Sequence, residues 1–205
     1  MSDTTQGKGP DYRQPIVFPK QGKPVGRTTF FATGFGPADW GRIVGVLYKD
    51  GSTTKYEGVT IRQPSASASW VVHFSVPDAE THSNYTLRIH QKTSSGPVLA
   101  ERPKIKFKFP WGVPVGSPGN GEDCCSDYFF AMGSLTGADT DISNPTMTRS
   151  GQDPVESNQR ILVDPDWFAD WPVLDQPYDY TLEVYGNGGG QGTVTNLHLA
   201  TGNCS

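Results

Sequence analysis

The chain has 205 residues, 35% of them hydrophobic, and a formal net charge of −4. Its 24 glycines and 17 prolines together exceed the usual combined share of about 12% of residues, so we expect many turns and few long helices. No apolar run approaches the roughly 18 residues of a membrane-spanning helix, and the first six residues are polar. We therefore expect no membrane insertion and no secretory signal. Cytoplasmic synthesis would be followed by assembly into a particle or by export along another route.

Charge is divided unevenly along the chain. Residues 1–110 carry 15 Lys and Arg against 8 Asp and Glu, a balance of +7. Residues 111–205 carry 2 against 13, a balance of −11. Such a split is typical of two modules with different surfaces. We expect a polar arm over residues 1–14, a basic domain over 15–110 and an acidic domain over 111–205.

The three cysteines, Cys124, Cys125 and Cys204, all lie in the acidic half. Neighbouring cysteines rarely bridge each other, because the resulting geometry is strained. Either all three are reduced thiols, or one of the adjacent pair bridges Cys204. The chain has no C-x-x-C pair, so no zinc site is predicted.

The two halves share a repeated order of motifs. Four segments of the first half recur in the second at offsets between 95 and 100 residues: 30–34, 38–39, 49–51 and 84–89 return as 129–133, 138–139, 149–151 and 179–184. Pro77 also returns as Pro172, at an offset of 95. We interpret the chain as an internal duplication of one fold.

Each copy is predicted to consist of short antiparallel strands. In the first copy we expect strands at 16–18, 28–33, 43–48, 56–62, 70–76, 85–89 and 105–109. Asp50-Gly51 is typical of a tight hairpin turn. In the last strand, alternation places Ile105 and Phe107 inside and the intervening lysines outside. Each Phe-Phe pair, at 30–31 and 129–130, should point one ring inward and one outward.

Seven short strands in about 95 residues, with frequent turn signals, resemble the immunoglobulin-like sandwich. Tyr85 and Tyr180, near the start of the penultimate strand, resemble the tyrosine corner of that class. The expected fold class is all-β, with two tandem immunoglobulin-like antiparallel β-sandwiches. The antibody pattern of Cys, Trp and Cys is absent. The resemblance is therefore to the broad immunoglobulin-like or fibronectin-like class, and it implies no activity.

An aromatic cluster at 166–171 has the composition of a sugar-stacking surface. The repeat indicates otherwise, because an offset of 95 aligns Trp167, Ala169 and Trp171 with three inward positions at 72, 74 and 76. Only Phe168, aligned with His73, should face outward. His90 should also face outward, from a strand of the other sheet, so we expect no convergence of histidines on a ligand.

Two polar loops suggest ligand sites that their details do not support. Residues 139–143 resemble the start of a calcium loop, but Asn144 and Ser150 occupy positions that require Gly and Glu. A looser site with Asp164, Asp166 or Asp170 is the alternative to solvated acidic loops. The glycine-rich segment 186–192 lacks the Lys-Ser/Thr of a phosphate loop and leads into a strand. We expect a flexible loop there.

No recognised catalytic motif occurs, so we predict no enzyme, no cofactor and no metal site. The feature that indicates a partner is a basic stripe of Lys104, Lys106 and Lys108, extended by Arg88 and His90 on the neighbouring strand. It suits an acidic protein face, an acidic polysaccharide or nucleic acid. The absence of a recognition helix disfavours nucleic acid. The alternative is a sheet edge protected by lysines.

The second copy reverses this charge. Arg88 aligns with Glu183, and residues 193–205 contain no Lys or Arg. A basic module beside an acidic one suits self-association, in which the basic domain of one chain meets the acidic domain of the next. Screening by salt should weaken such a contact. Trp111, in a proline-flanked linker, is expected to pack at the domain junction.

These patterns favour a non-enzymatic structural or interaction protein, a subunit of a larger assembly such as a virion decoration, an appendage or a scaffold. One alternative is a carbohydrate-binding or adhesion module at a cell surface. It would need exposed flat aromatics, for which Trp40, Tyr12 and Trp111 are the candidates. A second alternative is an accessory domain of an enzyme complex.

Overall fold

A computed structural model describes residues 15–19, 24–25, 28–65, 69–107, 115–117, 123–125, 129–135, 138–171, 174 and 177–200. The described part of the chain divides into an N-terminal unit within Arg13–Gly112 and a C-terminal unit within Val113–Ser205. The described regular elements are strands, apart from one turn of 3-10 helix, η1 (Ala38–Trp40). The fold class is all-β, as predicted.

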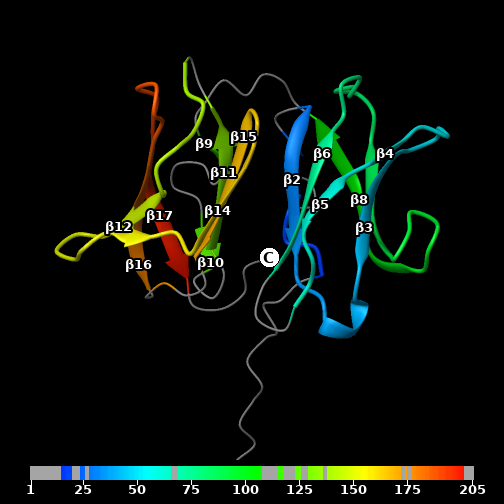
Figure 1. Ribbon diagram of the computed structural model, residues 1–205, viewed down its shortest axis with the longest axis horizontal. Coiled ribbons are helices and arrows are strands. Elements are labelled where there is room, and N and C mark those ends of the chain that lie inside the picture. Colours follow the sequence, from blue (N-terminus) through cyan, green and yellow to red (C-terminus); the bar gives the residue numbers. More distant parts are fainter. Residues whose placement is uncertain are drawn as a thin grey trace, which may run out of the picture. The chain divides into compact units, whose positions relative to one another are not determined.

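The N-terminal unit is a sandwich of two sheets, seen as two layers in Figure 1. Its larger sheet has the order β1-β8-β7-β3-β4 and its smaller sheet the order β2-β6-β5. The strands are β1 (Pro24–Val25), β2 (Thr29–Gly34), β3 (Ile43–Lys49), β4 (Lys55–Glu57), β5 (Val59–Arg62), β6 (Trp70–Ser75), β7 (Tyr85–Gln91) and β8 (Val98–Phe107). β1 runs parallel to β8, whereas Phe18, ahead of β1, bridges to Thr33 in β2.

The C-terminal unit repeats this arrangement. Its sheets have the orders β10-β17-β16-β12-β13 and β14-β15-β11-β9, and β10 runs parallel to β17. The strands are β9 (Val115–Ser117), β10 (Asp123–Cys125), β11 (Phe129–Ser134), β12 (Thr146–Thr148), β13 (Val155–Glu156), β14 (Gln159–Val163), β15 (Asp166–Trp171), β16 (Tyr178–Tyr185) and β17 (Gln191–Ala200). Both units have the strand order of immunoglobulin-like sandwiches, which confirms the predicted fold and duplication.

Strand register corrects one part of the sequence alignment. Phe30 pairs with Phe74 across β2 and β6, and Phe129 pairs with Trp171 across β11 and β15. With Phe30 equivalent to Phe129, the offset on the second strand is 97 rather than 95. Trp167 therefore corresponds to Trp70, not to Val72. The two offsets differ by two residues, which is one full period of a strand, so the predicted facing is unchanged. The two tryptophans of β15 are fully buried, as expected.

Each core lies between the two sheets of its unit. In the N-terminal unit, Phe30 stacks on Phe74 at 5.3 Å, and Phe107 packs edge-on against Tyr85 at 4.9 Å. Burying each such ring contributes roughly 2 kcal/mol. The hydroxyl of Tyr85 accepts a hydrogen bond of 2.9 Å from the backbone N–H of Glu80, which confirms a tyrosine corner. Tyr180 is buried at the equivalent register position in the C-terminal unit.

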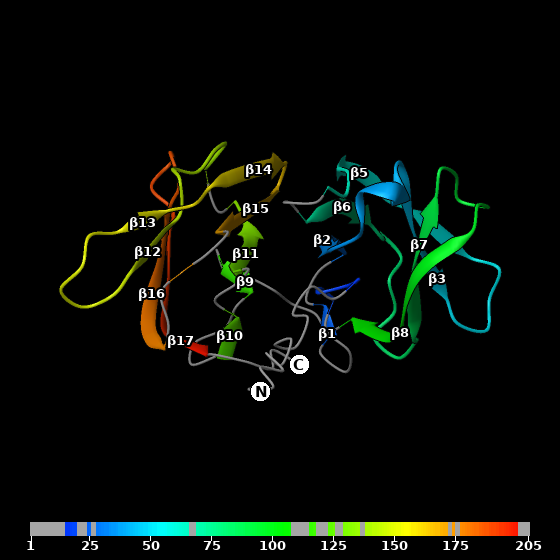
Figure 2. The same ribbon diagram turned by 90° about the horizontal axis from the view of Figure 1, so that it is seen from below.

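The predicted single strand over 56–62 is wrong. β4 pairs with β3 in the larger sheet, whereas β5 pairs with β6 in the smaller one, and the chain changes sheets at Gly58. A Cβ atom on Gly58 would lie 2.4 Å from Val72, so only glycine fits at this crossing. Figure 2 shows the corresponding passage from β13 to β14 in the C-terminal unit.

The predicted exposure of several outer-face residues is also wrong. His73 is buried and packs against Phe31 at 4.8 Å, and Phe168 is buried in a stack with Phe130 at 6.0 Å. The alternation of facing is correct, but on the outer face of each smaller sheet an aromatic side chain packs on a cross-strand neighbour. Facing away from the core therefore does not expose these residues.

Both units contain a β-bulge at the same place. The register of β8 shifts between its partners Tyr85 and Leu87, and the bulged strand carries Lys104 with a positive φ of 59°. The register of β17 shifts between Tyr180 and Leu182, where Asn196 has a φ of 56°. No motif in the sequence indicated this feature.

Several predictions fall outside the described residues: the arm at 1–14, Lys108, the linker with Trp111, Tyr12 and Cys204. The backbone of Cys124 and Cys125 forms part of β10, opposite Leu199 and Ala200. Both alternatives, three reduced thiols or a bridge from one of this pair to Cys204, stay predictions.

Candidate interaction surfaces

Two lysines of the predicted basic stripe are exposed on β8. Lys104 and Lys106 point to solvent, while Ile105 and Phe107 between and beyond them are buried in the core. The alternation predicted for this strand is therefore confirmed over its described part. These two side chains, the β8 lysines, form an exposed basic surface on the N-terminal unit.

Arg88 does not extend this surface as a free cation. Its Nε donates to Glu101 Oε2 at 2.7 Å, and its guanidinium lies over the ring of Tyr48, 5.0 Å from the centroid. Glu101 is the register partner of Arg88 on β8. Because both partners are over two-fifths exposed, the ion pair contributes at most about 1 kcal/mol to stability. It does offset the charge of Arg88 locally.

The predicted exposure of His90 is wrong, because only 5% of its surface is accessible. Nδ1 lies 2.8 Å from the carbonyl oxygen of Gly96, and Nε2 lies 3.2 Å from the hydroxyl of Tyr48. In the neutral ring, Nδ1–H donates to Gly96 and Nε2 accepts from Tyr48. The loop after β7 folds back over the ring. Alternation along the strand does not predict this contact between Gly96 and His90. The contact removes His90 from the basic surface.

The C-terminal unit has different chemistry at the same register positions. Asn196 and His198 replace the β8 lysines, and His198 Nδ1 lies 2.9 Å from Asp179 Oδ1. Glu183 replaces Arg88 and accepts a hydrogen bond of 3.1 Å from the hydroxyl of Tyr185, which raises the pKa of that tyrosine. The predicted reversal of charge between positions 88 and 183 is present in the fold.

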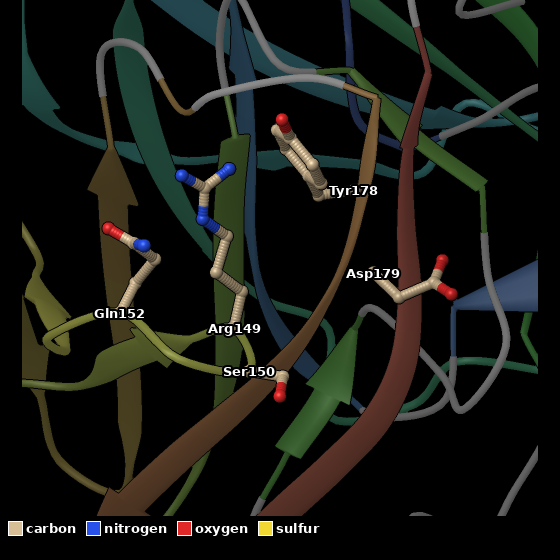
Figure 3. A pocket seen from close by; sticks show the side chains of 5 residues that line it. All are labelled: Arg149, Ser150, Gln152, Tyr178 and Asp179. Atoms are coloured by element: carbon tan, nitrogen blue, oxygen red, sulfur yellow. The ribbon is translucent and has the colours of Figure 1, made fainter.

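A shallow pocket of about 390 Å³ lies at one end of the C-terminal unit. It is lined by Arg149, Ser150, Gln152, Tyr178 and Asp179 (Figure 3). The guanidinium of Arg149 lies 4.0 Å from the ring centroid of Tyr178, which is 48% exposed. Figure 3 shows Arg149, Gln152 and Tyr178 on one side of β16, while the carboxylate of Asp179 points away from them. The result is an aromatic ring framed by a cation and an amide.

Sequence reasoning did not identify this pocket, because Tyr178 and Arg149 are 29 positions apart and neither belongs to a motif. Among the aromatic residues proposed instead, Trp40 is only half-buried and its ring packs against Gly36. It is not a flat exposed platform. Tyr12 and Trp111 lie outside the described residues.

Two of the acidic residues proposed for a looser calcium site are engaged in separate contacts. Asp141 pairs with Arg160 at 3.0 Å, and Asp166 accepts from the hydroxyl of Ser134 at 2.8 Å. Within the described part of the chain, no three His, Cys, Asp or Glu side chains are grouped as metal ligands would be.

The predicted glycine-rich loop between the last two strands is present, and it makes several hydrogen bonds. The loop joins β16 to β17, and hydrogen bonds tie it to the segment before β12. The backbone N–H groups of Gly188 and Gly190 both donate to Asp139 Oδ1, at 2.7 and 3.2 Å. The side chain of Asn187 adds further bonds to Thr140 and Asp141.

The geometry thus defines a tandem immunoglobulin-like protein with two chemically different surfaces. No protein-family model and no curated protein matches the chain. Among solved structures, a three-domain immunoglobulin fragment of titin is similar over 92% of this chain, with 13% identity and a TM-score of 0.29. This chain spans 64% of that fragment. None of the described helices is long and apolar enough to cross a membrane.

Two further solved structures show comparable similarity. Titin domains Z1Z2 in complex with telethonin match 93% of this chain and 95% of their own, at 14% identity and a TM-score of 0.31. The Bacteroides ovatus SGBP-B protein of a mixed-linkage glucan utilization locus, in complex with a mixed-linkage heptasaccharide, matches 84% of this chain and 42% of its own. Its identity is 14% and its TM-score 0.30. The fold class of this chain rests on its own strand order, and its ligands are not inferred from these proteins.

Proposed function

We propose that this chain is a non-enzymatic interaction protein, a subunit of a larger assembly, whose N-terminal unit docks on an acidic protein surface. The observation that supports this is the reversal of charge at equivalent positions of one topology. Asn196 and His198 occupy the register positions that the β8 lysines have in the N-terminal unit, and Glu183 occupies the position of Arg88. A duplicated module keeps its core for stability, so a systematic change outside the core indicates different partners.

The first partner we propose is the acidic unit of another copy of the chain. The halves carry balances of +7 and −11, which are complementary in sign. Complementary charge mainly accelerates and orients association, and its effect is screened over about 8 Å at physiological salt. The contact between copies is therefore expected to weaken as salt is raised.

Sedimentation velocity at low and high salt tests this proposal. We expect association at low salt, and its loss in Lys104→Glu and in Lys106→Glu, each made alone. Lys55→Glu is the matched control, because Lys55 is an exposed lysine on β4, at the opposite edge of the same sheet. A monomer at every salt concentration would exclude self-association. Equal effects of the three variants would show that net charge, not the β8 lysines, is responsible.

A second candidate function, carbohydrate binding, is favoured by the pocket at Tyr178. Sugar rings stack their C–H faces on exposed aromatic rings, and their hydroxyls bond to planar polar groups such as those of Arg149 and Gln152. NMR titration with cellohexaose and maltohexaose, up to about 10 mM, tests it through the side-chain signals of Gln152. Tyr178→Ala should weaken binding about tenfold. Tyr185→Ala, which removes another exposed tyrosine of β16, should not.

A further inference from the structure

The glycine-rich loop contains the dipeptide Asn187-Gly188 on the surface of the C-terminal unit. Asparagine followed by glycine is the sequence most prone to deamidation, since glycine leaves its backbone nitrogen sterically free to attack the preceding side chain. Both residues are exposed to water, which supplies the base and the later hydrolysis. In an unrestrained loop such a pair reacts readily.

The fold restrains the attacking nitrogen. The N–H of Gly188 donates to Asp139 Oδ1 at 2.7 Å, so the nitrogen is directed at Asp139. The negative charge of that carboxylate also opposes removal of the amide proton. The loop cannot easily shift away, because Gly190 donates to the same oxygen and the N–H of Gly186 donates to the carbonyl of Gly190 at 2.7 Å.

The side chain of Asn187 is restrained as well. Its Oδ1 accepts from the backbone N–H groups of Thr140 and Asp141, at 2.9 and 3.1 Å. Its Nδ2 donates to Thr140 Oγ1 at 2.9 Å. Cyclisation would have to rotate the amide and break these bonds, each contributing about 1 kcal/mol. The electrophile and the nucleophile are thus held by the same segment, residues 139–141, and kept apart.

We propose that Asn187 is a deamidation site that the intact clamp with Asp139 suppresses. When the loop opens, the nitrogen of Gly188 attacks Cγ of Asn187. The new C–N bond replaces the bond from Cγ to Nδ2, and ammonia leaves with the proton lost by the backbone nitrogen. Water then opens the succinimide to aspartate or isoaspartate. No oxidant or reductant is required.

The reaction would prevent the clamp from closing again. The product lacks the Nδ2 donor to Thr140 and places a new carboxylate beside Asp139 and Asp141, where like charges repel. The N-terminal unit has no counterpart, because its corresponding loop, residues 92–97, contains no asparagine. At this loop the modification is therefore confined to the C-terminal unit, and it is one-way. A second Asn-Gly pair, Asn120-Gly121, lies outside the described residues.

Peptide mapping by mass spectrometry, with quantification of isoaspartate at 187, tests this. In the native wild-type chain we expect deamidation of Asn187 to be at least about tenfold slower than in urea, because local opening must precede it. Asp139→Asn should raise the native rate toward the rate in urea. Asp179→Asn is the matched control, since it removes an exposed carboxylate of the same unit outside the clamp.

Two results would overturn the proposal. The first is an equal rate at Asn187 in native and urea-treated wild-type protein, a comparison that needs no variant to fold. The second is a native Asp139→Asn chain, shown folded by its thermal unfolding, that deamidates no faster than the wild type.

Discussion

The two units differ most clearly at one corner, where β3 ends in the N-terminal unit and β12 ends in the C-terminal unit. In the N-terminal unit, Lys49 donates to Glu80 at 2.5 Å, and Glu80 also accepts from Ser83. The pKa of Lys49 is raised by this hydrogen bond and that of Glu80 is lowered by it. In the C-terminal unit the positions of Lys49 and Ser83 hold Arg149 and Tyr178, stacked at 4.0 Å. One backbone thus supports an ion pair in one copy and an aromatic pocket in the other.

What the units share is backbone geometry that side-chain chemistry does not determine. Sheet order, the parallel strand at the sheet edge and the bulge with a positive φ recur in both. The bulge is kept although lysine occupies it in one unit and asparagine in the other. Pairing geometry therefore persists after duplication, while exposed charges can change at little cost in stability because each contributes little to it.

The largest effect is expected at the equivalent core tryptophans. Trp70→Ala and Trp167→Ala should each reduce the free energy of unfolding of their own unit by about 3–5 kcal/mol, since both side chains are fully buried. Urea unfolding of the full chain measures this. A much smaller loss for one of the two would indicate that they are not equivalent core positions, contrary to the register.

A smaller effect is expected at the bulge. Lys104→Val and Asn196→Val should each destabilise by about 1–2 kcal/mol, because a β-branched residue is disfavoured at positive φ. Lys104→Gly should instead stabilise slightly, since glycine adopts this conformation without strain. Thermal unfolding distinguishes these outcomes. Destabilisation by both substitutions at Lys104 would mean that the lysine side chain, and not the backbone conformation, matters there.

At the position of reversed charge we expect effects below about 1 kcal/mol. Arg88→Ala loses the exposed pair with Glu101, and Glu183→Ala loses an exposed hydrogen bond from Tyr185. Chemical denaturation at low and high salt should show a loss for Arg88→Ala that diminishes with salt. A loss of several kcal/mol for either variant would contradict the view that these exposed charges contribute little to stability.

The smallest effect on stability near neutral pH is expected at Tyr56. Its equivalent in the C-terminal unit is Val155, because Tyr56 pairs with Leu47 and Val155 with Met147. Burial, together with its hydrogen bond to Asp78, raises the pKa of Tyr56 from 10.0 to about 12. The folded state therefore favours the neutral phenol. This stabilisation is present below pH 10 and is lost as pH rises toward about 12.

Tyr56→Phe should remove one tyrosine that ionises well above pH 10 from an alkaline absorbance titration, and should reduce the alkaline loss of stability. Val155→Ala is the control, because that position has no ionisable group. An unchanged titration curve in Tyr56→Phe would contradict the assignment of the raised pKa to this residue.

Much of the fold could be predicted because strand facing is a local property. Successive residues of a strand alternate between two faces, so the pattern of Trp167, Ala169 and Trp171 was sufficient to assign them to a core. The tyrosine corner at Tyr85 could likewise be predicted from its position relative to neighbouring strands. The duplication was visible because motifs recurred in order.

The candidate surfaces were predicted less well. The β8 lysines follow from alternation and are exposed, but whether Arg88 is free depends on Glu101, which only the pairing of β7 with β8 places beside it. The pocket at Tyr178 requires Arg149 from another strand, which no periodicity indicates. Both features depend on contacts between residues that are distant along the chain.

The sequence by itself determined the all-β class, the two copies and the facing of most core side chains, because these follow from local alternation and repetition. Only the tertiary structure decided the sheet change at Gly58, the offset of 97 that matches Trp167 to Trp70, and the burial of His90 beneath its own loop. The physical reason is that register and exposure are set by which neighbours a strand acquires in space, and a linear pattern does not specify those neighbours.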